Sequence, residues 1–356
     1  MSEKISELEF FWLGIAVILP TIVITAPNIV IQECGGAGWA SIIAAGLSMG
    51  LLNHLFLTLG CNFSNKSIIA DSKDIFGPLL GKIILIPYIL VLIMTNIMLL
   101  IFSTGYITFV MEESSIIVFW VAISILVAYL SSKGIEVIAR SNSIGSLILL
   151  LGIVIILLTT PLVVSLKLAR LKPLVFNIKK IIAGGLYPAR LFFYHSVILI
   201  VLKPYFIDKR RVIKAIGFSN LVIQMVFSIL VIFLVGILGR NLASILNFSF
   251  HNLSDLSLSG VEVITFVIWI LGNILKMGIF NFVTVKLIAD CFELKDYKKV
   301  VIPFTILILT LTIYSSDISL PGLVTKYFVI GVLTTVSLPT ILLLTLAYAI
   351  ANRSRK

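Results

Sequence analysis

The pattern of hydrophobic and polar positions divides the chain into long apolar runs separated by short polar connections. Most runs are about 20 residues long, the length that an α-helix needs to cross the hydrocarbon core of a bilayer. The pattern therefore predicts an all-α integral membrane protein with about ten transmembrane helices. The predicted spans are residues 9–30, 38–60, 79–104, 115–131, 138–160, 183–204, 214–238, 261–285, 299–316 and 325–350.

The composition supports a membrane protein and excludes a soluble domain. Hydrophobic residues make up 60% of the chain and charged residues 12%, whereas a soluble domain carries about a quarter charged residues. The net charge of +11 does not indicate a nucleic-acid partner, because the basic residues are scattered through short connections instead of forming a stripe with interleaved aromatic residues.

The distribution of basic residues predicts the orientation in the membrane. An even number of spans places both termini on the same side. With the N-terminus inside, most of the 27 lysine and arginine residues fall in inner segments, as the positive-inside rule requires. We therefore expect both termini in the cytoplasm.

The sequence contains no pattern for covalent catalysis, for a structural metal or for a bound cofactor. The three cysteines, Cys34, Cys61 and Cys291, lack the spacing of a metal site or of a disulfide framework. Nucleotide-binding and hydrolase motifs are missing as well. We therefore expect no enzyme activity, no metal and no cofactor.

Two predicted spans contain residues that interrupt helices. Span one carries Pro20 and Pro27, and span six carries Gly184, Gly185 and Pro188. We predict a single transmembrane domain, 1–356, built as a 5+5 inverted repeat with halves of about 9–160 and 183–350; spans one and six would open the two halves. Interrupted helices at matching positions are typical of a transporter-like central binding site. The alternative is an ordinary proline kink, since proline is common in membrane helices.

Polar and aromatic residues near these positions are candidate ligand contacts. For the residues on span three, hydrogen bonding between helices is an equally good interpretation. His195 is interpreted as either a site residue or a packing residue. The candidates are Thr21, Ile22 and Thr25 in span one, Thr95 and Asn96 in span three, and Tyr187, Phe193, Tyr194 and His195 in span six.

Lys276 is the most unusual residue of the predicted membrane interior. It lies about 15 Å along span eight from Lys286 at the inner edge, too deep for its ammonium to reach water easily. Lys276 shares a helical face with other polar residues, Asn273 among them, so this face must contact protein or water. We expect a functional role for Lys276, together with Asn273; the alternative is a structural lysine that holds backbone carbonyls.

Several segments resemble one family over nearly the whole chain. In order and spacing they are similar to the B-type permease subunits of spore germinant receptors, within the amino acid–polyamine–organocation superfamily. The segments are Leu19–Pro27, Gly38–Ala40, Asp74–Gly77 with Leu80–Lys82, Gly134–Glu136 with Ala139–Arg140, Lys203–Pro204 with Asp208–Arg211, and Trp269–Gly272 with Ile274–Lys276.

The resemblance implies a LeuT-like inverted repeat of ten helices, with helices one and six interrupted, in the spore inner membrane. It also implies a subunit that senses a small nutrient, often an amino acid, together with A-type and C-type receptor subunits. By similarity to transporters of this superfamily, Lys276 with Asn273 would replace a coupling cation or bind the ligand. The rival hypothesis is a secondary amino acid transporter coupled to H⁺ or Na⁺, because broken helices describe a binding site and not its output.

Overall fold

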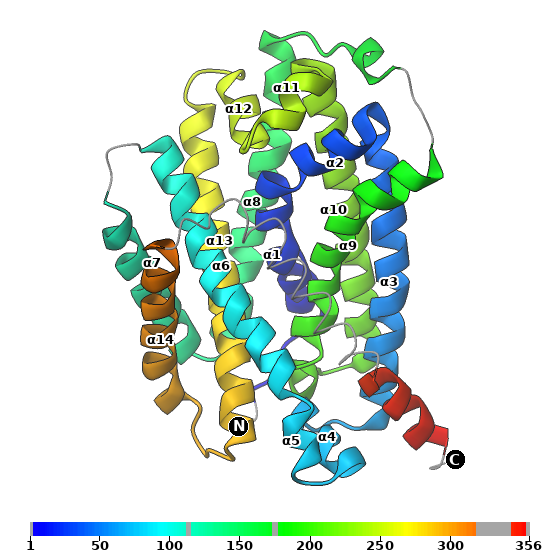
Figure 1. Cartoon of the computed structure of the whole chain (residues 1–356), viewed down its shortest axis with the longest axis vertical. Coiled ribbons are helices and arrows are strands. Elements are labelled where there is room, and N and C mark those ends of the chain that lie inside the picture. The colour runs from blue at the N-terminus through cyan, green and yellow to red at the C-terminus, as the bar shows by residue number, and fades with distance from the viewer. Residues whose placement is uncertain (1–2, 112–114, 173–176, 318–342, 354–356) are drawn as a thin grey trace.

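The computed structural model describes residues 3–111, 115–172, 177–317 and 343–353, without the side chains of residues 25, 194–197, 316 and 317. The described residues form a bundle of long α-helices that run roughly along the longest axis of the molecule (Figure 1). The helices are α1 Glu7–Thr25, α2 Pro27–Cys34, α3 Gly38–Phe63, α4 Ile68–Phe76, α5 Leu80–Ile83, α6 Ile86–Val110, α7 Ile116–Ser132, α8 Ile135–Val163, α9 Ile178–Leu199, α10 Lys209–Leu238, α11 Arg240–Ile245, α12 Ser249–Asp255, α13 Val261–Cys291 and α14 Lys298–Asp317.

Short 3-10 turns join some of these helices, and one further helical segment follows α14. The turns are η1 Gly35–Ala37, η2 Leu168–Leu171 and η3 Lys203–Tyr205, and the last described helical segment is 343–353. The first nine predicted spans each coincide with a long helix or with the pair α1 and α2. Most of the tenth predicted span, 325–350, lies outside the described residues.

The length and surface of the helices suit a lipid environment. Among the described residues, seven spans are long and apolar enough to cross a membrane. Large apolar side chains face outward from the bundle, such as Leu51 of α3, Leu158 of α8 and Met225 of α10. In water such a surface would be unfavourable, whereas lipid chains solvate it. The predicted all-α membrane architecture is confirmed.

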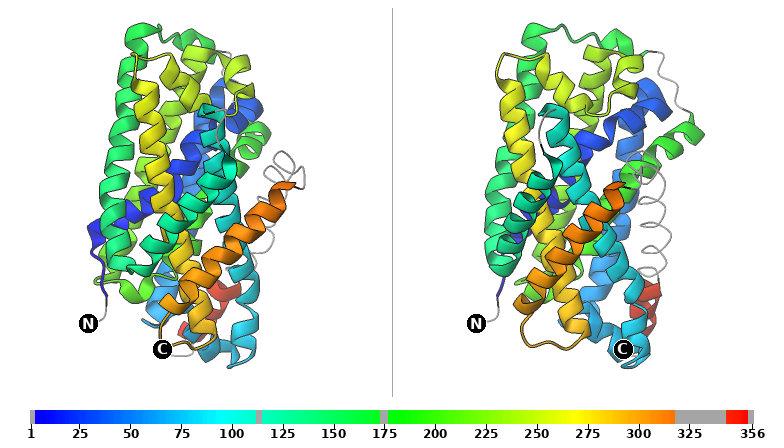
Figure 2. Two further views of the ribbon diagram at one scale, coloured as in Figure 1. Left: turned by 90° about the vertical axis from the view of Figure 1, so that its left-hand side faces the viewer. Right: turned by 60° about the vertical axis from the view of Figure 1, so that its left-hand side comes forward.

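Helix α1 lies at the centre of the bundle. It packs against α8, α9, α10 and α13, and Figures 1 and 2 show it enclosed by these helices. Its N-terminus is fixed by a capping box, in which Ser6 and Glu9 exchange hydrogen bonds with each other's backbone N–H. On the outside of the bundle, α14 packs against α7, α6 and α13.

The helix of span one is divided where its second proline predicts. Helix α1 ends at Thr25 and α2 begins with Pro27 at its first position. Ala26 between them keeps helical angles, φ −97° and ψ −28°, so the division is a bend and not an unwound loop. Pro27 has no N–H for the preceding turn, whereas Pro20 is accommodated inside α1.

The predicted interruption of span six is wrong. Helix α9 continues from Ile178 to Leu199 through Gly184, Gly185 and Pro188. The two glycines serve close packing instead. A Cβ atom on Gly184 would lie 2.3 Å from Cys34 Sγ, and one on Gly185 would lie 3.2 Å from the carbonyl oxygen of Ser41. The glycines therefore allow α9 to approach α2 and α3 closely without a break in the helix.

The first and last described segments lie at the same end of the bundle, next to α4 and α5 (Figure 1). Residues 3–6 run along this end, and the backbone N–H of Ile5 donates to the carbonyl oxygen of Tyr205 at 3.0 Å. Helices α2, α11 and α12 lie at the opposite end. Following the predicted orientation, we name this end the outer end and the end with α4 and α5 the inner end.

Candidate functional site

Helix α13 carries a series of polar residues through the interior of the bundle. Asn273, Lys276, Asn281 and Thr284 are all at most 2% exposed. The half-buried Glu262 accepts a hydrogen bond from the backbone N–H of Gly260 at 3.0 Å. The polar face of span eight therefore contacts protein and not lipid, as its helical spacing predicts.

Lys276 reaches the central helix. Its side chain is 1% exposed, its ammonium group donates a hydrogen bond to the hydroxyl of Thr21, and it lies 5.5 Å from the centre of the Phe280 ring. Thr21 belongs to α1, between Pro20 and the bend at Ala26. The structure thus brings together two predicted residues that are 255 positions apart.

Asn273 and the predicted residues of span three form a seam between α13 and α6. Asn273 donates to the hydroxyl of Ser103, and Asn96 donates to the hydroxyl of Thr284 at 3.0 Å. The hydroxyl of Thr95 bonds to the carbonyl of Val91 in its own helix at 2.8 Å. Asn96 and Thr95 therefore make the hydrogen bonds within and between helices that the alternative interpretation describes.

The remaining predicted residues make no hydrogen bond in the Lys276–Thr21 contact, or their side chains lie outside the described residues. Ile22 is fully buried in the apolar core of α1, and Phe193 of α9 is 5% exposed. Tyr187 is half-buried against the same core. The side chains of Thr25, Tyr194 and His195 lie outside the described residues.

A tryptophan contact with α1 was not anticipated. The indole N–H of Trp269 donates to the carbonyl oxygen of Pro20 at 2.6 Å. Trp269 precedes Lys276 by seven positions, which is two helical turns on the same face of α13. A buried indole N–H usually has a hydrogen-bond acceptor. The sequence could therefore have predicted that Trp269 donates a hydrogen bond, but it does not identify the acceptor. Trp269 and Lys276 of α13 therefore donate hydrogen bonds to the consecutive residues Pro20 and Thr21 of α1.

An aromatic cluster lies between Trp269 and the outer end. The Tyr106 ring of α6 contacts the Trp269 ring edge-on, with centroids 4.4 Å apart and planes at 68°. Tyr106 also contacts Phe248 at 5.2 Å and Phe266 at 5.7 Å. Edge-on and tilted ring pairs of this kind are favourable. The cluster packs against Trp269, two helical turns from Lys276 along α13 toward the outer end.

His251 links the aromatic cluster to α12 at the outer end of the bundle. Its Nδ1 lies 2.8 Å from the Tyr106 hydroxyl, and its Nε2 lies 3.5 Å from Asp255 Oδ1. A carboxylate near Nε2 favours a proton on that nitrogen, so the Nδ1 of neutral His251 accepts a hydrogen bond from the Tyr106 hydroxyl. Burial lowers the pKa of His251, and Asp255 and Glu262 partly oppose that shift.

We expect this contact to make the folded protein less stable in weak acid. In the unfolded chain His251 titrates near its ordinary pKa of 6.5, so below that pH the unfolded state binds more protons than the folded state, and stability falls. Thermal unfolding in detergent at pH 7.5 and 5.5 tests this. The melting temperature of the parent protein should fall more than that of His251→Gln; equal decreases would contradict the assignment.

A cleft of about 290 Å³ opens at the outer end between α2, the start of α9 and α11. It combines the carboxylate of Glu33 with the cationic side chains of Lys180 and Arg240. Arg240 also donates to the carbonyl oxygen of Leu171 at 2.5 Å. The residues that line the cleft are Ile31, Gln32, Glu33, Cys34, Gly35, Lys180, Arg240, Asn241 and Ser244. The cleft therefore offers both signs of charge beside the outer half of helix one.

The fold is similar to that of solved membrane transporters. The structure of MhsT in complex with L-phenylalanine matches with a TM-score of 0.71 at 15% identity, over 98% of this chain and 89% of that one. The substrate-bound, outward-open structure of a Na⁺-coupled sialic acid symporter matches with a TM-score of 0.61 at 12% identity, over 91% of this chain and 78% of that one. The architecture is thus the LeuT-like fold that the resemblance implies.

Sequence comparison supplies the family. No curated protein sequence matches the chain. The family model described as "Spore germination protein" matches residues 4–319, nearly the whole chain and every helix from α1 to α14. With a fold of membrane permeases and a family match of this length, the chain belongs to the spore germination protein family of spore permeases.

Proposed function

We propose that this protein is the nutrient-binding membrane subunit of a germinant receptor. It binds a small zwitterionic nutrient, an amino acid, and passes the resulting change of conformation to A-type and C-type partner subunits in the spore inner membrane. Membership of the spore germination family and a permease fold support this proposal. MhsT, which shares the fold, is bound to L-phenylalanine.

The observation that carries the proposal is the buried contact between Lys276 and Thr21. Burial of an ammonium group inside the membrane costs free energy, so such a group is a candidate functional residue. This one donates to Thr21 of helix one, five residues before the bend at Ala26. A bound carboxylate near this point would be stabilised by the ammonium charge. The same charge also takes the place that a coupling cation would occupy between α1 and α13.

The outer cleft supports an amino acid as the ligand. An amino acid carries one carboxylate and one ammonium group, and the cleft places Glu33 near Lys180 and Arg240. The cleft borders α2, the outer continuation of α1, so a ligand that enters here meets the same helix that Lys276 contacts. We propose that the nutrient approaches the membrane interior along this helix.

Sensing and transport make different demands on the same site. A sensor requires only that the nutrient bind one conformation more tightly than another, whereas a carrier must also release it on the far side. The Na⁺-coupled symporter of similar fold keeps the carrier as the rival hypothesis. A fixed ammonium at the α1–α13 contact supports a function that does not require Na⁺.

Reconstituted vesicles that contain only this chain distinguish the two functions. Each of the twenty amino acids is tested for a thermal shift of the protein and then for uptake as the radiolabelled compound. We expect saturable, Na⁺-independent binding without accumulation inside the vesicles. Saturable accumulation by the isolated chain would show a transporter instead. Spores that lack the gene should lose germination with the amino acid that binds.

The proposed orientation leads to a labelling prediction. With both termini in the cytoplasm, the exposed residue Asn241 at the start of α11 lies outside, and Lys295, between α13 and α14, lies inside. In a chain whose three native cysteines are replaced by serine, a membrane-impermeant maleimide added to intact cells should label Asn241→Cys. Lys295→Cys should react only after the cells are opened. The reverse pattern would contradict the orientation.

A further inference from the structure

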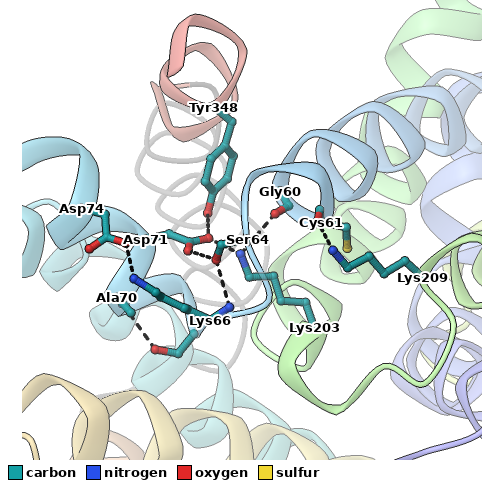
Figure 3. A network of polar contacts seen from close by, with 11 residues as sticks. Gly60, Cys61, Ser64, Lys66, Ala70, Asp71, Asp74, Lys203, Lys209 and Tyr348 are labelled. Atoms are coloured by element: carbon teal, nitrogen blue, oxygen red, sulfur yellow. Dashed lines mark hydrogen bonds and ion pairs between the residues drawn. The ribbon is translucent and has the colours of Figure 1, made fainter. Parts of the chain in front are cut away.

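A buried polar network lies beside α4, at the end of the bundle opposite α2 and α11 (Figure 1), and Figure 3 shows it from close by. Asp71 of α4 and Lys203 of η3 form an ion pair in which both side chains are at most 1% exposed. Lys203 also donates to the carbonyl oxygen of Gly60 at 3.2 Å. The Tyr348 hydroxyl donates to Asp71 at 3.0 Å, and Ser64 donates to the other carboxylate oxygen. The network therefore joins four segments of the chain.

The four segments come together at this network. Gly60 and Ser64 belong to the end of α3, Asp71 to the first turn of α4, Lys203 to the turn after α9, and Tyr348 to the helical segment 343–353. In Figure 3 the Tyr348 side chain points from that last segment directly toward Asp71. Asp71 lies 132 positions from Lys203 and 277 from Tyr348. The carboxylate of Asp71 therefore connects the early part of the sequence with residues near its middle and near its end.

Local structure favours the charge of Asp71 at this place. Ser67 caps α4 by accepting a hydrogen bond from the backbone N–H of Ala70 at 3.3 Å. Asp71 lies within the first turn that follows, where the helix dipole stabilises a carboxylate.

Two other lysines bond to backbone carbonyls near the network. Lys209 donates to the carbonyl oxygen of Cys61 at 2.6 Å, and Lys4 donates to that of Pro204 at 2.9 Å.

The energetics of a buried ion pair suit a latch better than a permanent clamp. Such a pair adds little stability beyond what apolar residues of similar size would provide, but the loss of one partner leaves an uncompensated buried charge. Two arrangements are therefore favourable, one in which the two partners are paired and one in which both are in water. Arrangements that leave one charge buried without the other are unfavourable. Short non-helical stretches, 64–67 and 206–208, adjoin both partners and allow the segments to separate.

We propose that Asp71, Lys203 and Tyr348 form a latch that closes the inner end of the bundle. While the latch is closed, it holds the end of α9 against the α3–α4 connection and the segment 343–353. When it opens, water enters along the inner ends of α3 and α9. Because α9 also packs against α1, motion of the central helix reaches Lys203 through α9. This latch is independent of which molecule the outer cleft binds.

A native cysteine reports the state of the latch. Cys61 is 1% exposed and lies in the last turn of α3, next to Gly60 of the network. In the full chain with Cys34→Ser and Cys291→Ser, inside-out vesicles are treated with a membrane-impermeant maleimide. Asp71→Asn removes the carboxylate charge that holds Lys203. We expect this variant to label at Cys61 at least tenfold faster than its parent.

Asp74→Asn is the matched control. Asp74 lies on the same helix, three residues later, and pairs with Lys66 at 2.7 Å in an exposed ion pair. Its substitution should leave the labelling rate unchanged. General loosening is tested with Ser219→Cys, a buried position of α10, placed in a chain that lacks the native cysteines and carries Asp71→Asn. This cysteine should stay unreactive; labelling there as fast as at Cys61 would overturn the latch.

Two further variants keep the proposal testable if Asp71→Asn does not fold. Tyr348→Phe removes one hydrogen bond and should raise the labelling rate of Cys61 about threefold. The exchange Asp71→Lys with Lys203→Asp restores opposite charges and should label more slowly than Lys203→Asp alone. Folded variants are identified by a single symmetric peak in size-exclusion chromatography. If folded Tyr348→Phe labels at the parent rate and the exchange does not slow labelling, the latch is refuted.

Discussion

Lys276→Met is expected to abolish the nutrient response of the protein while the chain remains folded. Methionine matches the length and apolar stem of lysine but has no ammonium group to donate to Thr21. Burial of an ammonium group is itself unfavourable, so its replacement by an apolar side chain of similar volume should leave the chain folded. We expect at least a tenfold loss of apparent nutrient affinity, about 1.4 kcal/mol, measured as a germination dose–response and as ligand binding in vesicles.

Lys286→Met is the control for this prediction. Lys286 lies on the same helix and forms an ion pair with Asp290 at 2.7 Å, but its side chain is 30% exposed. Its substitution should leave the response almost unchanged. Thr21→Val removes only the hydroxyl partner of Lys276 and should reduce affinity less than Lys276→Met does. A normal dose–response in folded Lys276→Met would remove the proposed role of this lysine.

Gly36→Ala is expected to destabilise the outer end of the protein. A Cβ atom at this position would lie 2.0 Å from the backbone carbonyl oxygen of Leu171 and 2.9 Å from Nη2 of Arg240. The clash involves backbone, so it cannot be relieved by a side-chain rotation alone. Overpacking of this kind lowers the free energy of unfolding by about 1–3 kcal/mol. The measurement is the melting temperature in detergent.

Gly105→Ala provides the opposite case. Gly105 lies in α6, and a Cβ atom there would meet nothing within 4 Å. Alanine is favoured over glycine in a helix by about 1 kcal/mol, so this variant should be as stable as the parent or more so. Equal melting temperatures for Gly36→Ala and Gly105→Ala would show that the space around Gly36 is larger than the structure indicates.

The sequence was sufficient for the architecture because run length is a local property. Apolar runs of bilayer length predicted the spans, and helical spacing predicted that Lys276 and Asn273 face the interior. The family resemblance supplied the inverted-repeat fold. The division of the chain into repeats at about 9–160 and 183–350 stays a prediction.

The sequence was insufficient where the same residues serve two purposes. Gly184, Gly185 and Pro188 predicted an interrupted helix, yet the glycines allow α9 to pack closely on α2 and α3. Composition alone does not separate these uses, because both require the absence of a side chain. The pairing of Asp71 with Lys203 and Tyr348 was likewise beyond prediction, since charge shows that a partner is needed but not which distant segment provides it.

The continuity of α9 has a mechanical consequence. Its 22 residues, Pro188 among them, form one helix about 33 Å long, so both ends of α9 belong to a single element. A tilt that begins where Gly184 packs against Cys34 would therefore also displace the turn that carries Lys203. Under the proposed sensing function, a nutrient bound at the outer end would be detected at the other end without crossing the membrane.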